Sequence, residues 1–287
     1  MAFTKSEVEA LAPIVKFHPD EKYFPMDPVE FIRKSRFRHH RGLQSDQGYH
    51  RTKKKWVTSN SKAKSYYDIP IRVINAYRKW SNGENRRPRD PNCGDDWNVF
   101  LQPKGRLKGV SRPTGKVPAF FFQRHRDTTT IPAKDRRMLN IKAEKYDLVS
   151  YWWFNGYNDG PLSQNHQGDW EHVTLKLKKK KLVGVYFFAH GSTEGMVPTS
   201  RIKRTGGRVV VYCARGSHAS YAAPGSYKLI LGQKDEAKNG GYAWDISQNL
   251  MSLRTQPWRH YAGAWGEVGD FEFTTGPLGP WHKRNKA

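Results

Sequence analysis

Cysteine is nearly absent from this sequence: its 287 residues include only Cys93 and Cys213. Two cysteines are too few for a disulfide framework. Neither belongs to a Cys-x-x-Cys pair, which argues against a zinc site made of thiolates. A single disulfide is possible at this stage, but two reduced thiols are favoured.

Long apolar runs are also missing. No stretch of about 18 apolar residues occurs, so the sequence predicts no transmembrane helix. The opening residues 1–7 lack the apolar core of a signal peptide. We therefore expect a protein that is made without a signal peptide and is either cytoplasmic or exported by a non-classical route.

Acidic residues are in short supply. The chain has 26 Asp and Glu against 50 Lys and Arg, which gives a formal net charge of +24. Solubility alone needs a charge of only about 2–8 for a small domain. A field this strong attracts polyanions, so the predicted partner is an anionic lipid surface or a nucleic acid. The oligomeric state is not predicted.

The positive charge is densest in residues 33–64, which hold eleven Lys or Arg and a single acid, Asp46. The segment has little periodicity and is predicted to be a basic loop or arm. It could bind phosphates, or it could be a solvated surface loop. The candidate polyanion-binding residues are Lys53, Lys54, Lys55, Arg36, Arg38 and Arg41.

Aromatic residues and turn formers are abundant, with 10 Trp, 14 Tyr, 25 Gly and 17 Pro. Aromatics favour sheets, whereas Gly and Pro favour turns. Strands do not alternate with long helices, which argues against a Rossmann or barrel α/β fold. The sequence predicts a mostly β protein: one β-sandwich-like domain over 1–287, with short peripheral helices and long basic loops. The second such loop is the Pro-, Gly- and Arg-rich segment 82–117.

Local patterns locate several elements. Asp27 as N-cap, with Pro28 and Glu30 after it, predicts a short helix. Apolar and polar residues alternate over 173–178, as they do in a half-buried strand, and a turn leads to a second strand over 182–189. Further strands are predicted at 11–17, 118–122, 147–154 and 208–213.

The most informative segment is 165–172, Asn-His-Gln-Gly-Asp-Trp-Glu-His. If it opens the strand that continues to Leu177, Asp169 and Glu171 share one face, and Trp170 and His172 share the other. Two carboxylates close together resist ionisation unless a cation, a shared proton or a basic partner stabilises them.

His166, in a Gly-containing turn, can fold back toward these carboxylates. A histidine and two carboxylates suit a divalent cation, with Mg²⁺, Ca²⁺ or Mn²⁺ favoured. The predicted metal ligands are therefore His166, Asp169 and Glu171, and Asp159 could add a fourth. Alternatively, the two carboxylates are structural and pair with some of the many cations.

Two further histidines follow predicted strands. His190 lies in a Gly- and Ser-containing turn, and so does His218, where functional groups often occur. If these strands neighbour the first one, both histidines could converge on the carboxylates. Glu171, His190 and His218 are the candidate catalytic residues, in which case the enzyme would be a metal-dependent hydrolase. No Gly-x-Ser-x-Gly elbow supports a serine hydrolase.

With these motifs the sequence resembles the vacuolar protein sorting-associated protein sixty-two family over most of its length. The similar segments, in chain order, are 11–14, 17–25, 151–156, 166–174, His190, 216–221, Trp258, 263–266 and 276–280. The basic segments 33–64 and 82–117 are less typical of that family. The family's name implies trafficking but does not establish a reaction.

A more distant resemblance is to the necrosis- and ethylene-inducing-like proteins, which carry Gly-His-Arg-His-Asp-Trp-Glu after an aromatic strand. It implies that His166, Asp169 and Glu171 stand where that family binds its metal, with Asp159 near the place of a further Asp. Gly168 stands where the family has its second His. Those proteins are β-sandwiches that bind a divalent cation and damage membranes at lipid head groups. They are secreted with disulfides, and this chain shows neither a signal nor such a framework.

Three functions are therefore carried forward. The first is a toxin-like or effector-like protein with a divalent-metal site that engages an anionic target, above all a membrane surface. The second is a metal-dependent phosphoester hydrolase of the nuclease or phospholipase type. The third is a non-catalytic sorting or binding module with a structural ion.

Overall fold

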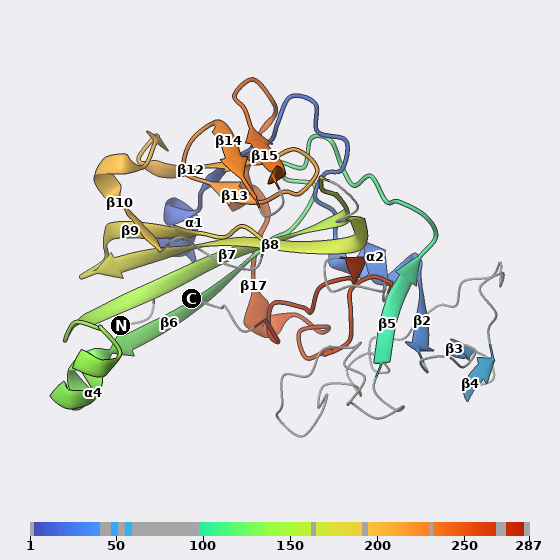
Figure 1. Ribbon diagram of the computed structural model, residues 1–287, viewed down its shortest axis with the longest axis horizontal. Coiled ribbons are helices and arrows are strands. Elements are labelled where there is room, and N and C mark those ends of the chain that lie inside the picture. The colour runs from blue at the N-terminus through green and yellow to red at the C-terminus, as the bar shows by residue number, and fades with distance from the viewer. Residues whose placement is uncertain are drawn as a thin grey trace.

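The structure, a computed structural model, describes residues 3–40, 47–50, 55–58, 98–161, 165–190, 195–229, 232–267 and 274–283. Strands predominate and helices are short, so the predicted mostly β fold is confirmed. Four sheets are present in these ranges, of two to six strands each (Figure 1).

The largest sheet has six strands and contains the 165–172 segment. Its strands, in spatial order, are β10 (Met196–Pro198), β9 (Lys181–Phe187), β8 (Asn165–Lys178), β7 (Lys145–Asp159), β6 (Ala119–Asp127) and β17 (Leu250–Ser252). The predicted hairpin of β8 and β9 is confirmed, with Lys178 opposite Lys181. The predicted strands at 118–122 and 147–154 correspond to β6 and β7, and both extend further than expected.

A second sheet packs on the first. It contains β11 (Arg204–Thr205), β12 (Arg208–Cys213), β1 (Ile14–Lys16), β16 (Ala243–Asp245) and, paired with β12, β13 (Ser220–Tyr221). Residues of both sheets form one buried cluster, in which Tyr151 and Val173 of the first sheet meet Val15, Val211 and Trp244 of the second. This two-layer arrangement confirms the predicted sandwich.

The opposite face of the six-stranded sheet carries a second, more aromatic cluster. Its large buried members are Phe31, Phe37, Phe120, Trp152, Phe154, Trp170, Trp258, Tyr261 and Trp265. Trp170 makes ring contacts with Phe154, Trp258 and Trp265 at centroid distances of 4.9–5.3 Å. The six-stranded sheet is therefore buried on both faces along residues 168–175 of β8, which places Asp169 and Glu171 deep in the molecule.

The helices are peripheral, as predicted. Within the described ranges they are α1 (Lys5–Leu11), α2 (Pro28–Arg33) and α4 (Ala133–Met138), with 3₁₀ turns η1 (Thr128–Thr130), η2 (Thr199–Arg201), η4 (Ile246–Asn249) and η5 (Leu253–Thr255). Helix α2 begins as expected, because Asp27 Oδ1 accepts a hydrogen bond of 2.8 Å from the Val29 amide. The predicted strand at 11–17 is shorter, since α1 occupies its first residue and only β1 is extended.

Both segments predicted as basic loops contain strands. Residues 33–64 include β2 (Ser35–His40), β3 (Gln47–His50) and β4 (Lys55–Thr58), and residues 82–117 include β5 (Asn98–Pro103). They form the four-stranded sheet β4-β3-β2-β5. The sequence did not predict β2, because its charged residues do not look like buried strand positions. Arg36 and Arg38 flank the buried Phe37 and are themselves buried. A last pair, β14 (Gly225–Lys228) and β15 (Lys234–Ala237), is antiparallel.

None of the helices in the described ranges is long and apolar enough to cross a membrane. Of the two cysteines, Cys213 is a buried free thiol at the end of β12, and burial raises its pKa well above the usual value. Cys93 lies outside the described residues. The buried thiol agrees with the expectation that Cys213 is reduced.

Candidate functional site

The predicted alternation along β8 is confirmed. Glu171 lies opposite Trp153, and Val173 lies opposite Tyr151, all on the face that packs against the second sheet. On the other face, Trp170 joins the aromatic cluster. His172 is stacked between Trp152 and Phe188, at 3.7 and 3.8 Å, so it is a packing residue.

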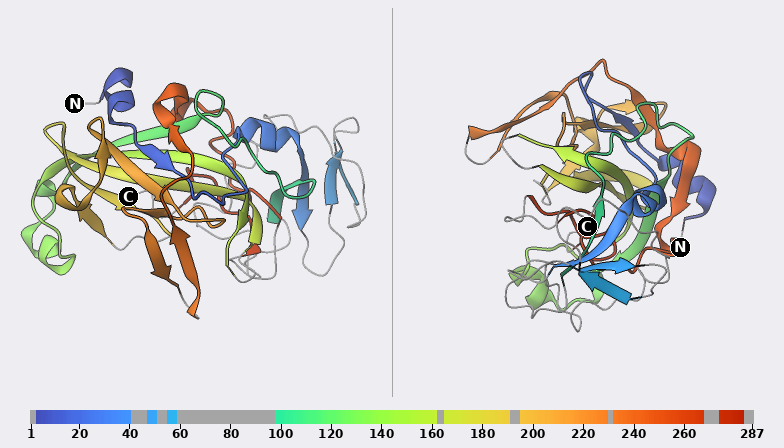
Figure 2. Two further views of the ribbon diagram at one scale, coloured as in Figure 1. Left: turned by 90° about the horizontal axis from the view of Figure 1, so that it is seen from above. Right: turned by 90° about the vertical axis from the view of Figure 1, so that its right-hand side faces the viewer.

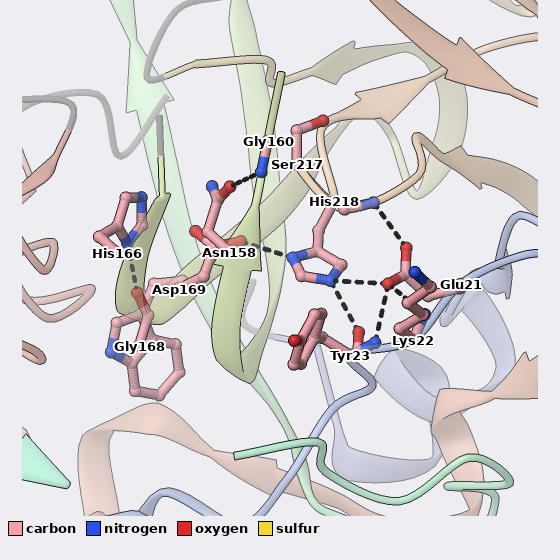
Figure 3. A network of polar contacts seen from close by, with 12 residues as sticks. Glu21, Lys22, Tyr23, Asn158, Gly160, His166, Gly168, Asp169, Ser217 and His218 are labelled. Atoms are coloured by element: carbon pink, nitrogen blue, oxygen red, sulfur yellow. Dashed lines mark hydrogen bonds and ion pairs between the residues drawn. The ribbon is translucent and has the colours of Figure 1, made fainter. Parts of the chain in front are cut away.

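His218 meets the first carboxylate, as the convergence hypothesis predicted (Figure 3). Its Nδ1 lies 2.8 Å from Asp169 Oδ2, and its Nε2 lies 2.7 Å from the Tyr23 carbonyl oxygen. A carbonyl only accepts hydrogen bonds and a carboxylate prefers to accept them, so both ring nitrogens donate. His218 is completely buried and sits at a φ of +57°, in the turn after Gly216. The geometry therefore holds it as an imidazolium.

Glu21 supplies the second negative charge next to His218, from a segment nearly 200 residues away in the sequence. Its Oε1 lies 3.6 Å from His218 Nε2 and accepts hydrogen bonds from the Lys22 and Tyr23 amides, and its Oε2 accepts one from the Gly216 amide at 2.8 Å. Burial lowers the pKa of His218, but Glu21 and Asp169 outweigh it and raise this pKa well above its usual range. The result is a buried triad of Asp169, His218 and Glu21.

The triad makes stability sensitive to acid. Burial opposes the charge on Glu21, but His218 and the amide donors together lower its pKa from 4.5 to about 2. Because the folded-state pKa is depressed, its contribution is fully present above about pH 4.5 and is lost as the pH falls toward 2. We expect the free energy of unfolding to drop by on the order of 3 kcal/mol over this window through Glu21. Urea denaturation at several pH values should show a flatter acid limb for Glu21→Gln, and an unchanged slope would contradict the assignment.

Glu171 differs from Asp169 because no described residue donates a hydrogen bond to its carboxylate. It is 9% exposed. Burial, and then the charge of Asp169, raise its pKa well above the usual value. The opposing charges are His218 and Lys283, whose Nζ donates to the Trp170 carbonyl oxygen at 2.5 Å. Glu171 is thus a buried acid that an added cation would ionise.

Asn155 lies directly opposite Asp169 in the β7–β8 register. It is completely buried, and neither its amide oxygen nor its amide nitrogen has a hydrogen-bond partner among the described residues. The Trp153 indole N–H, opposite Glu171, is likewise unpartnered within the described ranges. A buried polar group without a partner calls for an explanation such as an ion or water, and an amide oxygen is a ligand type of Ca²⁺ and Mg²⁺.

The other two predicted metal ligands, His166 and Asp159, do not form a metal-binding group with Asp169 and Glu171. His166 is half-buried in β8 rather than in a preceding turn, and its Nδ1 lies 2.8 Å from the Gly168 carbonyl oxygen (Figure 3). Nδ1 therefore carries the proton and Nε2 is left as a free lone pair, which is the state of a metal-ligating histidine. Asp159 is turned toward Arg106, with 3.8 Å between Oδ1 and Nη1. In the described part of the chain, no three His, Cys, Asp or Glu side chains form a ready-made metal site.

His190 forms a separate pair rather than joining Glu171. Its Nε2 donates to Asp235 Oδ2 at 2.8 Å, and Asp235 also accepts from the hydroxyls of Ser217 and Tyr221. Burial lowers the pKa of His190, and the contact with Asp235 outweighs it and raises this pKa. The link to the first group is indirect, through Ser217, which precedes His218. Of the three candidate catalytic residues, only Glu171 and His218 share one buried region.

The structure corrects part of the polyanion-binding prediction. Arg36 and Arg38 are 3% and 2% exposed, and each donates to Gln102 Oε1 at 2.8 Å. These two guanidinium groups therefore support the four-stranded sheet and are not presented to a polyanion. Arg41, Lys53 and Lys54 lie outside the described residues, and Lys55 is described only as the first residue of β4.

Three residues of this region were missed by sequence reasoning: Glu21, Asp235 and Lys283. Glu21 lies in the segment 17–25 that carries the family resemblance, and that signal could have pointed to it. Asp235 and Lys283 had no local signal. Asp235 is an acid in a short, otherwise polar strand, and Lys283 is one of 50 Lys and Arg residues.

A comparison with solved structures found several toxin-fold proteins. Necrosis and Ethylene inducing Protein 2, from the causal agent of cocoa's Witches Broom disease, matches with a TM-score of 0.35 at 12% identity, over 88% of this chain and 76% of that chain. NLPPya in complex with mannosamine matches with a TM-score of 0.40 at 12% identity, over 98% and 85%. A structure described as a toxin fold for microbial attack and plant defense has a TM-score of 0.38 at 14% identity, over 97% and 87%. TM-scores this low carry no argument about the site or the function.

The sequence comparisons support the first resemblance. The profile of the family described as Vacuolar protein sorting-associated protein 62 matches residues 161–275, which include β8 and the His218 turn. The Saccharomyces cerevisiae protein of that name is 22% identical over 95% of this chain and 64% of its own length. A second protein of that yeast, the vacuolar protein sorting-associated protein TDA6, is also 22% identical, over 95% and 65%. This chain thus spans slightly less than two thirds of the length of these curated relatives, and its resemblance to the family is confirmed.

Proposed function

We propose that this protein is a toxin-like or effector-like binding protein that takes up a divalent cation at Asp169 and Glu171 and engages an anionic membrane surface. Asn155, which lies opposite Asp169, is the further candidate ligand. The observation that carries the proposal is the burial of Glu171, which accepts no hydrogen bond from a described residue, on the same face of the sheet as the buried Asn155 amide, which has no hydrogen-bond partner among the described residues. Such a carboxylate is unexpected in a chain that has 50 Lys and Arg residues against 26 Asp and Glu.

The residues fit the donor chemistry of such an ion. Two carboxylates and an amide oxygen suit Ca²⁺, Mg²⁺ or Mn²⁺. His218 donates to Asp169 and so orients its carboxylate, as outer hydrogen-bond partners of metal ligands do. Lys283 supplies a balancing positive charge next to Glu171.

The burial of the candidate site favours the binding of an ion over catalysis. Asp169 and Glu171 are 4% and 9% exposed and His218 is inaccessible. A phosphoester of a nucleic acid or a lipid would have to reach these groups through the packed faces of the six-stranded sheet. The metal-dependent hydrolase hypothesis lacks a supporting observation in the described residues, whereas an ion that joins β7 and β8 needs no such access.

The anionic target rests on charge. A net charge of +24 draws the protein to anionic surfaces, and the relatives' name, vacuolar protein sorting-associated, suits a protein that works at membranes. Arg36 and Arg38 are buried and therefore contact neither kind of target.

A melting experiment tests the cation. After treatment with EDTA, addition of Ca²⁺, Mg²⁺ or Mn²⁺ should raise the Tm, since an ion at 100 times its Kd stabilises the fold by about 2.7 kcal/mol. We expect Glu171→Gln to lose this response, because the amide removes the ionisable oxygen at nearly constant shape. The matched control is Glu236→Gln, at a carboxylate that is solvent-exposed. No rise in the wild type, or an equal rise in Glu171→Gln, would refute the cation site.

Vesicle co-sedimentation tests the target. The protein should bind phosphatidylserine-containing vesicles and not pure phosphatidylcholine vesicles, and the binding should weaken as salt is raised past about 0.15 M. Absence of binding at that salt concentration would refute the membrane target. If the protein binds DNA under the same conditions and does not bind vesicles, the target of its positive charge is nucleic acid and not a membrane.

A further inference from the structure

The connection between β6 and β7 carries an exposed apolar cluster. Among the described residues, five large hydrophobic side chains are exposed, and three of them lie here: Met138 at 77%, Leu139 at 57% and Ile141 at 37%. They occupy the end of α4 and the turn after it. Figures 1 and 2 show α4 at one end of the molecule, beyond the strands it joins and far from the four-stranded sheet. An apolar cluster kept in water marks an interaction surface.

The backbone under this cluster is well held. Thr128 Oγ1 donates to the Lys142 carbonyl oxygen at 2.6 Å and accepts from the Glu144 amide at 2.9 Å, so the two ends of the connection are tied together. The Ile141 amide donates to the Arg136 carbonyl oxygen at 2.9 Å. The three apolar side chains are therefore presented by a defined turn.

Positive charge surrounds the cluster. Its exposed cations are Arg126, Lys134, Arg137, Lys142 and Lys145. The β8–β9 turn at the same end of the sheet adds four consecutive lysines, 178–181, all exposed. The two parts are joined, because Lys176 and Lys178 both form ion pairs with Glu144.

The turn between β8 and β9 has lysines at two positions where the backbone conformation favours Asn and Gly. Lys179 and Lys180 have φ values of +46° and +62°, the pattern of a two-residue hairpin turn in which Asn-Gly is strongly favoured. A lysine in this conformation costs stability relative to glycine. Two lysines at such positions are a local inconsistency of the kind that occurs at functional surfaces.

We propose that this end of the molecule, comprising α4, residues 139–145 and the turn 178–181, is the surface that docks on an anionic lipid bilayer, with Met138, Leu139 and Ile141 entering between the head groups. The proposal rests on the membrane target proposed above and names the surface that meets it. Apolar side chains ringed by Lys and Arg match the two layers of an anionic membrane, its acyl boundary and its phosphates.

This surface is distinct from the cation site. Lys178 is seven residues along β8 from Glu171, which is about 23 Å at roughly 3.3 Å per residue. A cation at Asp169 and Glu171 therefore does not bridge protein and lipid when this end docks. Its role would be to hold the sheet together, and vesicle binding should depend on the ion only through the stability of the fold.

Three forms of the full chain test the surface in phosphatidylserine/phosphatidylcholine vesicles. The triple variant Met138→Ser/Leu139→Ser/Ile141→Ser should bind at least about tenfold more weakly, with an unchanged Tm because the side chains are exposed. The variant Lys179→Asn/Lys180→Gly should also bind at least about tenfold more weakly, since each lysine near an anionic surface contributes about fivefold, and it should melt at a higher temperature. The control Met251→Ser, at a methionine that is 43% exposed elsewhere, should bind like the wild type.

The outcomes separate the two proposals. If the wild type does not bind these vesicles, the membrane target fails and the docking surface with it. If the wild type binds and both variants bind equally well, the docking surface alone is refuted. If the triple variant keeps its vesicle affinity but shifts from dimer to monomer in analytical ultracentrifugation, the cluster is a contact between copies of this chain, and the docking proposal is overturned.

Discussion

Replacing Gly168 with alanine is expected to destroy the native fold or to lower the free energy of unfolding by more than about 4 kcal/mol. Two features of the structure combine at this residue. Its φ is +65°, a region that residues with a side chain rarely adopt, and an added Cβ would lie 1.8 Å from the Trp265 carbonyl oxygen. That oxygen belongs to backbone packed in the aromatic cluster, so it cannot move aside cheaply.

The control for Gly168→Ala is Gly105→Ala. Gly105 has nearly the same φ, +70°, but nothing lies within 4 Å of its added Cβ. The conformational cost alone is about 1–2 kcal/mol, so the difference between the two variants measures the collision with Trp265. Urea or thermal denaturation of both proteins, with the fraction of folded protein checked by circular dichroism, gives this difference. Equal losses would mean that the backbone at Trp265 adapts and that the close approach is not essential.

This result would also explain a departure from the toxin-like motif. Gly168 stands where the necrosis- and ethylene-inducing-like proteins have a second histidine. In this chain a histidine there would place its Cβ against the Trp265 carbonyl oxygen. The packing of Trp265 over β8 thus excludes that ligand, and the cation site proposed here takes a donor from Asn155 instead.

Replacing His218 with alanine is expected to lower the free energy of unfolding by about 3–5 kcal/mol, because it leaves Asp169 and Glu21 buried without their shared cation. The loss also removes the hydrogen bond to the Tyr23 carbonyl oxygen, which ties the N-terminal segment to the sheet. Equilibrium denaturation near pH 7 measures the effect. Because protonation removes the charge of a buried, unpaired carboxylate, lowering the pH should reduce the difference in stability between the variant and the wild type.

His190→Ala is the matched control for His218→Ala. His190 also pairs with one carboxylate, but its side chain is 30% exposed, and Asp235 keeps the hydroxyl donors Ser217 and Tyr221. The His190→Ala substitution should therefore lower the free energy of unfolding clearly less than His218→Ala does. In a double-mutant cycle, Asp169→Asn should cost much less in the His218→Ala background than in the wild type, because the charge it removes is then unpaired. Additive losses would show that His218 and Asp169 do not act together.

Patterns that are local in the chain were sufficient for much of the fold. The alternation of Val173, Leu175 and Leu177 fixed one face of β8 in advance, and the structure places these residues in the inter-sheet core. Asp27 and Pro28 likewise predicted the start of α2, because an N-cap acts within one turn of the helix and so depends only on neighbouring residues. The capping box of Thr4 and Glu7 was equally local and would have revealed α1.

Where charge and burial disagreed, local reasoning was wrong. The strands within 33–64, and β5 within 82–117, were predicted as loops because the arginines and lysines concealed the strand period, whereas residues 104–117 do form the predicted loop. Strands β2 and β5 pair with each other across some sixty residues, and that pairing allows Arg36 and Arg38 to be buried with Gln102 between them. The aliphatic stems of arginine tolerate such burial once the guanidinium has an acceptor.

The sequence by itself determined that Asp169 and Glu171 share a face, because side-chain direction in a strand depends only on a period of two residues. Only the tertiary structure decided what meets them. Glu21 and His218 come from segments nearly 200 residues apart in the chain, and Lys283 reaches Trp170 across 113 residues. Contacts between distant segments depend on how the two sheets and the aromatic cluster pack, and packing is a property of the whole core rather than of any short stretch of residues.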